Sequence, residues 1–168
     1  MRYWCISTSP GNWEICRKNL VWGMDYGYYV TLKKFIRAGD KAVVYAGNGR
    51  FVAAIEFVGE CFYDERDLGW TKNRKPYLCP YRIKFRIICE SKQPPKIKSS
   101  IDPDKENKNK ARWNENGFNL IDDIVFITDK GRGLRGGARW NIFFQASIIN
   151  ISEEDFNTIK AAIESSRS

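Results

Sequence analysis

Two apolar runs joined by a short glycine-containing turn constrain the fold of this chain more than any other feature. The runs are Lys41–Ala46 and Phe51–Cys61, and Gly47-Asn48-Gly49-Arg50 lies between them. Such runs, separated by a turn with glycine, are typical of a β-hairpin. Neither run approaches the roughly 20 residues that cross a bilayer, so the hairpin is predicted to belong to the sheet of a globular domain.

Regular alternation and β-branched composition predict further strands. Arg2–Ser7 alternates aromatic and apolar residues. Tyr81–Glu90 places apolar side chains on one face and basic side chains on the other, as the two-residue period of a strand requires. The apolar stretches Ile121–Thr128 and Arg139–Ile151 are predicted to be strands of the same sheet.

Three segments carry helical signals. Asn12 is a candidate N-cap for a short helix in which apolar residues recur at helical spacing. Thr31 can cap a second helix over Leu32–Arg37. Ser152 lies three residues before a carboxylate, and apolar residues at helical spacing follow it. A C-terminal helix is therefore predicted over Glu153–Ser165.

Polar segments connect these elements. Asp64–Pro80 contains glycine and proline and is predicted to be a long surface loop. Residues 92–119 are rich in Lys and Asn, which is typical of an extended excursion. A chain of 168 residues fits one domain, residues 1–168. We therefore expect an α+β fold, a mixed and mostly antiparallel β-barrel with short flanking helices and a C-terminal helix.

The residue types that are missing limit the chemistry of the protein. The chain contains 0 His, and its 5 Cys are scattered without a C-x-x-C pair, so neither a metal site nor a disulfide framework is predicted. The sequence also lacks a phosphate-binding glycine motif and a serine in a nucleophile elbow. It therefore favours a non-catalytic protein without a cofactor. The first residues do not resemble a secretory signal, so a cytoplasmic location is expected.

The distribution of positive charge favours an anionic partner. Lys and Arg number 28 against 20 Asp and Glu, a formal charge of +8. The segment Lys130–Arg139 combines glycines with arginines that can fork onto phosphate oxygens. Two plainer interpretations remain open, a solvated strand face and a flexible hairpin tip kept soluble by arginine. The candidate phosphate contacts are Arg82, Lys84, Arg86, Arg132, Arg135 and Arg139.

Aromatic residues are 14% of the chain. Trp4, Trp13, Phe85 and Phe143 fall in periodic elements, where core packing is the expected role. Trp22 differs, because it stands beside a glycine at the start of a tyrosine-rich stretch that is predicted to be a loop, and both a core and a pocket position remain open for it. An aromatic wall suits a base that leaves its stack, because stacking contributes roughly 1–3 kcal/mol per base.

Several short motifs in register resemble the EVE domain family. The motifs are Tyr3-Trp4-Cys5-Ile6-Ser7, Asn12-Trp13-Glu14-Ile15-Cys16, Val21-Trp22-Gly23, Ala38-Gly39-Asp40-Lys41 with Val44-Tyr45, Pro80-Tyr81-Arg82-Ile83-Lys84 and Arg139-Trp140. The similarity runs from the first strand to the last helix and is interrupted over residues 91–119. The chain departs from the pattern at residues 24–27, where many family members have Val-Pro.

This resemblance implies a PUA-like fold related to the YTH domains, which bind methylated adenine in RNA. EVE domains are regarded as readers of modified bases in DNA or RNA, with the base held in an aromatic-lined pocket. Carried onto this chain, the resemblance and the tyrosine-rich stretch nominate seven pocket residues: Ser7, Thr8, Asn12, Trp13, Trp22, Gly23 and Tyr28. Trp22 is the leading candidate.

The sequence thus predicts a nucleic-acid-binding module that recognises a modified, methylated base and grips phosphates with basic residues. One alternative is an enzyme or small-ligand binder for a modified nucleoside on the same barrel, with Asp25, Glu56 or Lys84 as acid and base. A second is a protein-interaction module whose basic surface docks an acidic partner.

Overall fold

The computed structural model describes residues 1–25, 29–47, 50–97, 117–118 and 148–166. Its helices are α1 (Pro10–Asn19), α2 (Tyr29–Phe35) and α6 (Glu153–Ser165). Its strands are β1 (Tyr3–Ser7), β2 (Val21–Met24), β3 (Lys41–Tyr45), β4 (Phe51–Phe57), β5 (Phe62–Tyr63), β6 (Thr71–Lys72), β7 (Lys75–Pro76), β8 (Tyr81–Glu90), β9 (Lys96–Ile97), β10 (Gly117–Phe118) and β11 (Ile148–Ile151). None of the helices in these ranges is long and apolar enough to cross a membrane.

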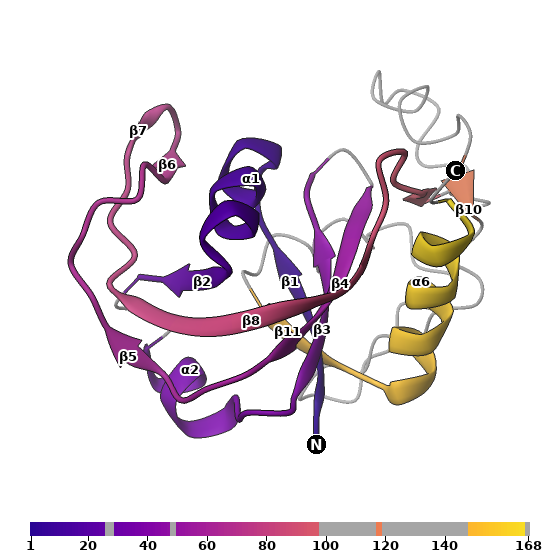
Figure 1. Cartoon of the computed structure of the whole chain (residues 1–168), viewed down its shortest axis with the longest axis horizontal. Coiled ribbons are helices and arrows are strands. Elements are labelled where there is room, and N and C mark those ends of the chain that lie inside the picture. The colour runs from indigo at the N-terminus through magenta and orange to yellow at the C-terminus, as the bar shows by residue number, and fades with distance from the viewer. Residues whose placement is uncertain (26–28, 48–49, 98–116, 119–147, 167–168) are drawn as a thin grey trace, which may run out of the picture.

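A curled sheet with the strand order β11-β1-β3-β4-β8-β2 forms the body of the protein (Figure 1). Its pairs are antiparallel except for β1 and β3, which run parallel. The long strand β8 connects the β11-β1-β3-β4 part of the sheet to β2 and β5. Its first half pairs with β2 and β5, and its second half pairs with β4. The pairing with β4 shifts by one residue between Ala54 and Ile55, a bulge that increases the local bend.

Helix α6 covers one face of the sheet. Strand β1 sends alternate residues to opposite faces, so Tyr3 and Cys5 lie against the helix. Phe156, Ile159 and Ile163 of α6 recur at helical spacing and complete this core. The Tyr3 hydroxyl also donates a hydrogen bond of 2.6 Å to Glu153, which ties the first strand to the last helix.

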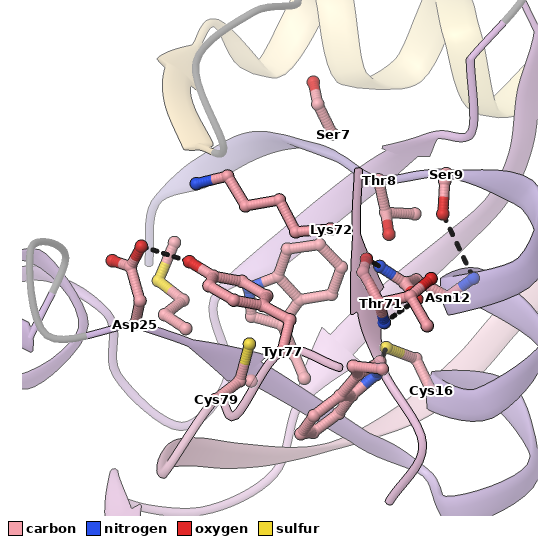
Figure 2. A pocket seen from close by; sticks show the side chains of 14 residues that line it. Ser7, Thr8, Ser9, Asn12, Cys16, Asp25, Thr71, Lys72, Tyr77 and Cys79 are labelled. Carbon is pink, nitrogen blue, oxygen red and sulfur yellow. Dashed lines mark hydrogen bonds between the residues drawn. The ribbon is translucent and has the colours of Figure 1, made fainter. Parts of the chain in front are cut away.

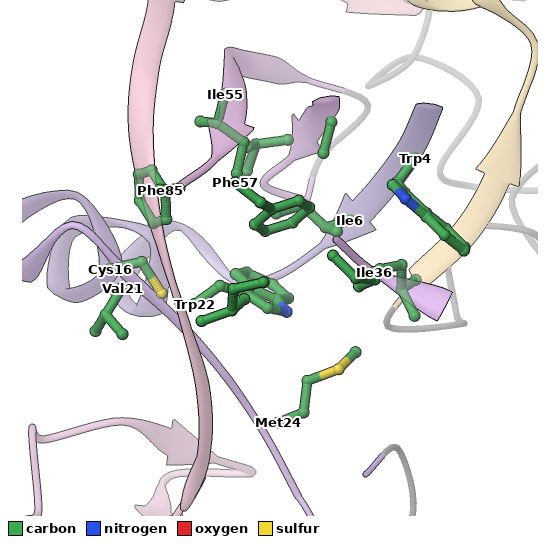
Figure 3. Close-up of a cluster of buried hydrophobic side chains, with 14 of the residues drawn as sticks. Trp4, Ile6, Cys16, Val21, Trp22, Met24, Ile36, Ile55, Phe57 and Phe85 are labelled. Atoms are coloured by element: carbon green, nitrogen blue, oxygen red, sulfur yellow. The ribbon is translucent and has the colours of Figure 1, made fainter. Parts of the chain in front are cut away.

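The second core fills the inside of the curl. The other residues of β1, Trp4 and Ile6, point into it together with side chains from α1, α2, β2, β4 and β8. Figure 3 shows several of these side chains, including Trp22, Phe57 and Phe85, gathered inside the curled sheet. The tryptophans Trp4, Trp13, Trp22 and Trp70 belong to the inner core, whereas the core under α6 contains none, and the segment between β5 and β8 contributes Trp70 and Cys79.

The strongest sequence signals give the correct elements. The predicted hairpin is β3 and β4, and β8 and α6 have the predicted bounds. The Ser152 hydroxyl caps α6 and accepts from the backbone N–H of Asp155 at 3.0 Å. Of the predicted strand Arg139–Ile151, residues 148–151 are described as β11, and Ile121–Thr128 lies outside the described residues.

Three local predictions are wrong. Helix α1 is capped by Ser9 rather than Asn12, with Pro10 as its first residue, because proline suits the first helical position, where its missing N–H has no partner to lose. Helix α2 begins at Tyr29, so Thr31 lies within it and does not cap it. The residues around Trp22 form strand β2, paired with β8, and do not open a loop.

The predicted loop Asp64–Pro80 contains a small hairpin. Strands β6 and β7 pair antiparallel around the two-residue turn Asn73-Arg74. Both turn residues have positive φ, 53° and 62°. That is the conformation of a type I′ turn, whose twist matches that of the flanking strands. The hairpin projects from one end of the molecule, beside α1 (Figure 1).

Candidate functional site

A pocket of about 160 Å³ opens between the end of β1, the start of α1, strand β2 and the β6–β7 hairpin. One water needs roughly 10–15 Å³ by the same kind of measure, so the pocket has room for a small planar group. Figure 2 shows its side chains. They are Ser7, Thr8, Ser9, Asn12, Cys16, Trp22, Gly23, Met24, Asp25, Trp70, Thr71, Lys72, Tyr77 and Cys79.

Three aromatic side chains form walls of this pocket. Trp22 comes from β2, whereas Trp70 and Tyr77 flank the β6–β7 hairpin. The Trp70 ring packs directly on the backbone of Gly23, where an added Cβ would lie 2.6 Å from its Cη2 atom. Glycine at this position therefore lets the second tryptophan approach the strand. The buried Nε1 of Trp22 has no hydrogen-bond partner among the described residues.

Two contacts hold the Trp70 ring in place. Its Nε1 donates to the Cys16 sulfur at 3.3 Å, and the Arg82 guanidinium lies over the ring, 5.0 Å from the centroid. A cation over an aromatic face is attracted by the ring quadrupole. The indole is thereby held between α1, β2 and β8, although its own segment has little regular structure.

The prediction that Arg82 contacts phosphate is wrong, because only 1% of its surface is exposed. Its Nη1 lies 2.9 Å from Asp64 Oδ2, an ion pair without the alignment of a hydrogen bond. Its other nitrogens donate to the carbonyl oxygens of Cys79, at 3.0 Å, and Arg66. The outward face of β8 is covered here by the segment that follows β5, so Arg82 anchors that segment and cannot face a ligand.

The Asp64 carboxylate is shared by two arginines. Hydrogen bonds from the Arg66 side chain and backbone, together with the charge of Arg82, hold the pKa of Asp64 well below its usual range. Asp64 is therefore ionised at neutral pH, and its negative charge balances the positive charge of the buried Arg82.

Asn12 fastens the hairpin to α1. Its Nδ2 donates to the carbonyl oxygen of Thr71 at 2.8 Å, and its Oδ1 accepts from the backbone N–H of Thr71 at 3.0 Å. The amide therefore pairs with Thr71 as a neighbouring strand would (Figure 2). By contrast, no hydrogen bond joins the Ser7 or Thr8 hydroxyl to another side chain of the described residues.

The mouth of the pocket carries one cation and one anion. Lys72 Nζ lies 4.9 Å from the centre of the Tyr77 ring, and the Tyr77 hydroxyl donates to the Asp25 carboxylate. Figure 2 shows Lys72, Tyr77 and Asp25 along the same side. These contacts set the orientation of the Tyr77 ring before any ligand enters.

The two pocket thiols are not prepared for nucleophilic attack. Burial raises the pKa of Cys16 to about 12 and, as the main cause, the pKa of Cys79 to about 12. Both are therefore protonated at neutral pH, and the thiolate is the reactive form. Across the described ranges, no cluster of three or more Cys, Asp or Glu side chains could hold a metal ion.

The structure gathers five of the seven predicted pocket residues: Ser7, Thr8, Asn12, Trp22 and Gly23. The placement of Trp13 in the pocket is wrong, because it does not line the cavity and instead stacks on Phe85 in the inner core. Tyr28 lies outside the described residues. Trp70 and Tyr77 also line the pocket and were not predicted, since their signal is two aromatic residues inside a mostly polar loop.

The predicted phosphate contacts are spread over the chain. Lys84 and Arg86 are exposed on β8, and Arg86 donates to Glu56 at 2.9 Å. Arg132, Arg135 and Arg139 lie outside the described residues.

A curled, mostly antiparallel sheet with flanking short helices defines a PUA-like domain. The family model of the EVE domain matches residues 2–162, and the chain belongs to that family. The UPF0310 protein PH1033 of Pyrococcus horikoshii is 29% identical over 172 residues, which cover 95% of this chain and 97% of that protein.

Solved structures of YTH domains have the same fold. The Pho92 YTH domain in complex with m6A superposes with a TM-score of 0.56 at 13% identity, over 97% of this chain and 83% of that one. The Mmi1 YTH domain complex with RNA gives a TM-score of 0.54 at 8% identity, over 98% of this chain and 78% of that one.

Proposed function

We propose that this protein binds nucleic acid and recognises a modified, methylated base turned out of the strand into the pocket beside α1. The observation that carries the proposal is the wall formed by Trp22, Trp70 and Tyr77. Aromatic faces stack on any base, and extrusion exposes the edges by which one base differs from another.

The pocket also offers groups that distinguish base edges. The hydroxyls of Ser7 and Thr8 line it and can donate or accept. The Trp22 Nε1, a buried donor with no partner among the described residues, would be satisfied by an acceptor on a ligand. A methyl group would add apolar contact with the aromatic walls. Solved domains of this fold that are complexed with RNA and with m6A support the same class of ligand.

Phosphate contacts would supply the part of the affinity that does not depend on the base. The exposed Lys84 and the predicted arginines Arg132, Arg135 and Arg139 remain candidates for these contacts, as does Arg86 despite its pairing with Glu56. The formal charge of +8 favours this partner over a neutral small molecule.

The test is a binding titration with matched oligonucleotides, as DNA and as RNA, carrying plain or methylated adenine or plain, methylated or hydroxymethylated cytosine. The expected result is tighter binding of one modified base. Tyr77→Ala removes one wall and should reduce that preference, because stacking contributes roughly 1–3 kcal/mol, about 5- to 150-fold in affinity.

Tyr63→Ala is the matched control, since Tyr63 is a tyrosine that is 57% exposed on β5 and does not line the pocket. It should leave the preference unchanged. Equal binding of all the oligonucleotides by the unaltered protein would exclude the proposed function. An unchanged preference in Tyr77→Ala would remove Tyr77 from the ligand wall.

A further inference from the structure

The β6–β7 hairpin carries three basic residues and no acidic one. Lys72, Arg74 and Lys75 lie within residues 71–76, and all three are exposed. The segment just before the hairpin, residues 64–70, holds Asp64, Glu65, Arg66 and Asp67, so the positive charge is concentrated at the projecting end. Figure 1 shows this end standing clear of the sheet.

The hairpin has a fixed position relative to the pocket. Asn12 holds the backbone of Thr71 at both its N–H and its carbonyl oxygen. Lys72 contacts the face of Tyr77, which is a wall of the pocket. The positive charge of the hairpin therefore begins at the pocket mouth, and its spacing from the mouth does not depend on a flexible linker.

The backbone conformation of the turn does not favour the arginine at its tip. Arg74 has φ 62°, a left-handed conformation that costs an ordinary side chain energy and costs glycine none. Asn-Gly is the preferred pair for this turn type, and this chain has asparagine in the first place but arginine in the second. Backbone strain of this kind clusters at functional sites.

We infer that the β6–β7 hairpin is a phosphate-binding element, in which Lys72, Arg74 and Lys75 contact the backbone of the nucleic-acid strand next to the base in the pocket. This inference rests on the proposed function for its ligand and adds a second contact surface to it. Arginine forks onto phosphate oxygens, and lysine contributes a mobile point charge. Arg74 is the central residue, because it occupies its position at a cost to the backbone.

The test compares two substitutions in the same turn. Arg74→Gly removes the charge and relieves the backbone, so its melting temperature should be equal to or higher than that of the unaltered protein. Asn73→Gly relieves the neighbouring position, φ 53°, and removes no charge. Both are titrated with the plain and modified oligonucleotides, as DNA and as RNA, from low to high salt.

Arg74→Gly should lower the slope of log K against log salt by about 0.7–0.9, the amount of one phosphate contact. If the non-electrostatic part of binding is unchanged, that slope corresponds to about five- to eightfold weaker binding at 0.1 M salt. Asn73→Gly should bind like the unaltered protein. Lys160→Ala, on the far side of the sheet in α6, is the control for loss of a positive charge elsewhere.

The readouts separate this inference from the proposed function. A lower slope with an unchanged preference for the modified base supports both. A lower slope in a protein that has no base preference supports the hairpin contact and excludes the reader. The inference is overturned if Arg74→Gly has the same salt slope as the unaltered protein, or if Lys160→Ala lowers the slope by the same amount. This holds even if the base preference stands. Absence of any binding to the oligonucleotides overturns both.

Discussion

Two parts of the curled sheet are covered in different ways. At one end, the regular amphipathic helix α6 supplies the apolar side chains that cover the sheet. Around the first half of β8, the irregular segment that follows β5 covers the sheet, and the buried Arg82 and the Asn12 amide hold it in place. The pocket lies beside this segment.

The difference shows how a small domain makes room for a ligand. A helix satisfies its own backbone hydrogen bonds and can pack its side chains without gaps. A segment without regular structure must find partners for its carbonyl oxygens elsewhere, and Arg82 provides them for Cys79 and Arg66. The same irregularity leaves a cavity between the segment and the strands. Three substitutions, each with a control, and one measurement of pH dependence test this difference.

The largest effect is expected from Arg82→Ala, which removes the anchor of the irregular cover. The change deletes a side chain that is 1% exposed, removes the donor to two carbonyl oxygens, and leaves Asp64 paired only with the exposed Arg66. Breaking a buried pair in this way costs about 3–5 kcal/mol. Urea unfolding measures the loss, and tryptophan fluorescence should report movement of Trp70.

Arg66→Ala is the matched control, because Arg66 contacts the same carboxylate with a side chain that is 80% exposed. It should cost about 0–1 kcal/mol. A cost equal to that of Arg82→Ala would show that the cover depends on the carboxylate rather than on burial of the arginine.

The low pKa of Asp64, which pairs with both Arg66 and Arg82, predicts how the stability of the protein depends on pH. The pKa of Asp64 is lower in the folded protein than in the unfolded chain, so its contribution is present above about pH 4 and is lost as the pH falls further. The difference in urea midpoint between the unaltered protein and Arg82→Ala should therefore narrow below pH 4. A constant difference would contradict the assignment to Asp64.

A smaller effect is expected on the face that α6 covers. Ile159→Ala creates a cavity at a fully buried position and should cost about 3 kcal/mol. Because Ile159 is remote from the pocket, the preference among oligonucleotides should be unchanged at a temperature where the variant is folded. Lys160→Ala, next to it in α6, loses only an ion pair with Glu164 and should cost about 0.3–0.5 kcal/mol.

The smallest effect on stability, and a large one on the pocket, is expected from Gly23→Ala. The new methyl group would meet Trp70 and Cys79 within 3 Å, so the ring has to move, at about 1–3 kcal/mol. Binding of the modified oligonucleotide should weaken in proportion to that displacement. Gly59→Ala is the control, because no atom lies within 4 Å of its added methyl group. Equal binding by both variants would show that Trp70 does not shape the ligand site.

Sequence patterns were sufficient where the signals are local. The alternation over β8 and the serine cap with its helical spacing gave both elements with correct bounds. The same alternation assigned Arg82 to the side opposite the inner core but implied that this side faces solvent. A two-residue period reports the side of a strand, and what covers that side is decided by a distant segment, here the one that holds Asp64.

The pocket was predicted only in part, because only some of its residues lie in local sequence motifs. Gly23 and Trp22 belong to a recognisable motif, so they were identified. Trp70 lies 54 positions from Cys16, the side chain that fixes its ring, and no periodic pattern surrounds it. Its position depends on contacts from α1, β2 and β8 together, and such contacts leave no trace in the spacing of residues along the chain.

The pairing of the first and last strands has a consequence for the order of folding. Strand β1 lies between β3 and β11, and the contact between Tyr3 and Asn150 spans 147 positions. The loop-closure entropy of so distant a pairing makes it slow relative to the local β3–β4 hairpin. During synthesis, β1 therefore keeps an open edge until residues 148–151 have left the ribosome. Ser7, which lines the pocket, pairs with Tyr45 of β3 and not with β11, so the pocket end of β1 does not depend on this late pairing.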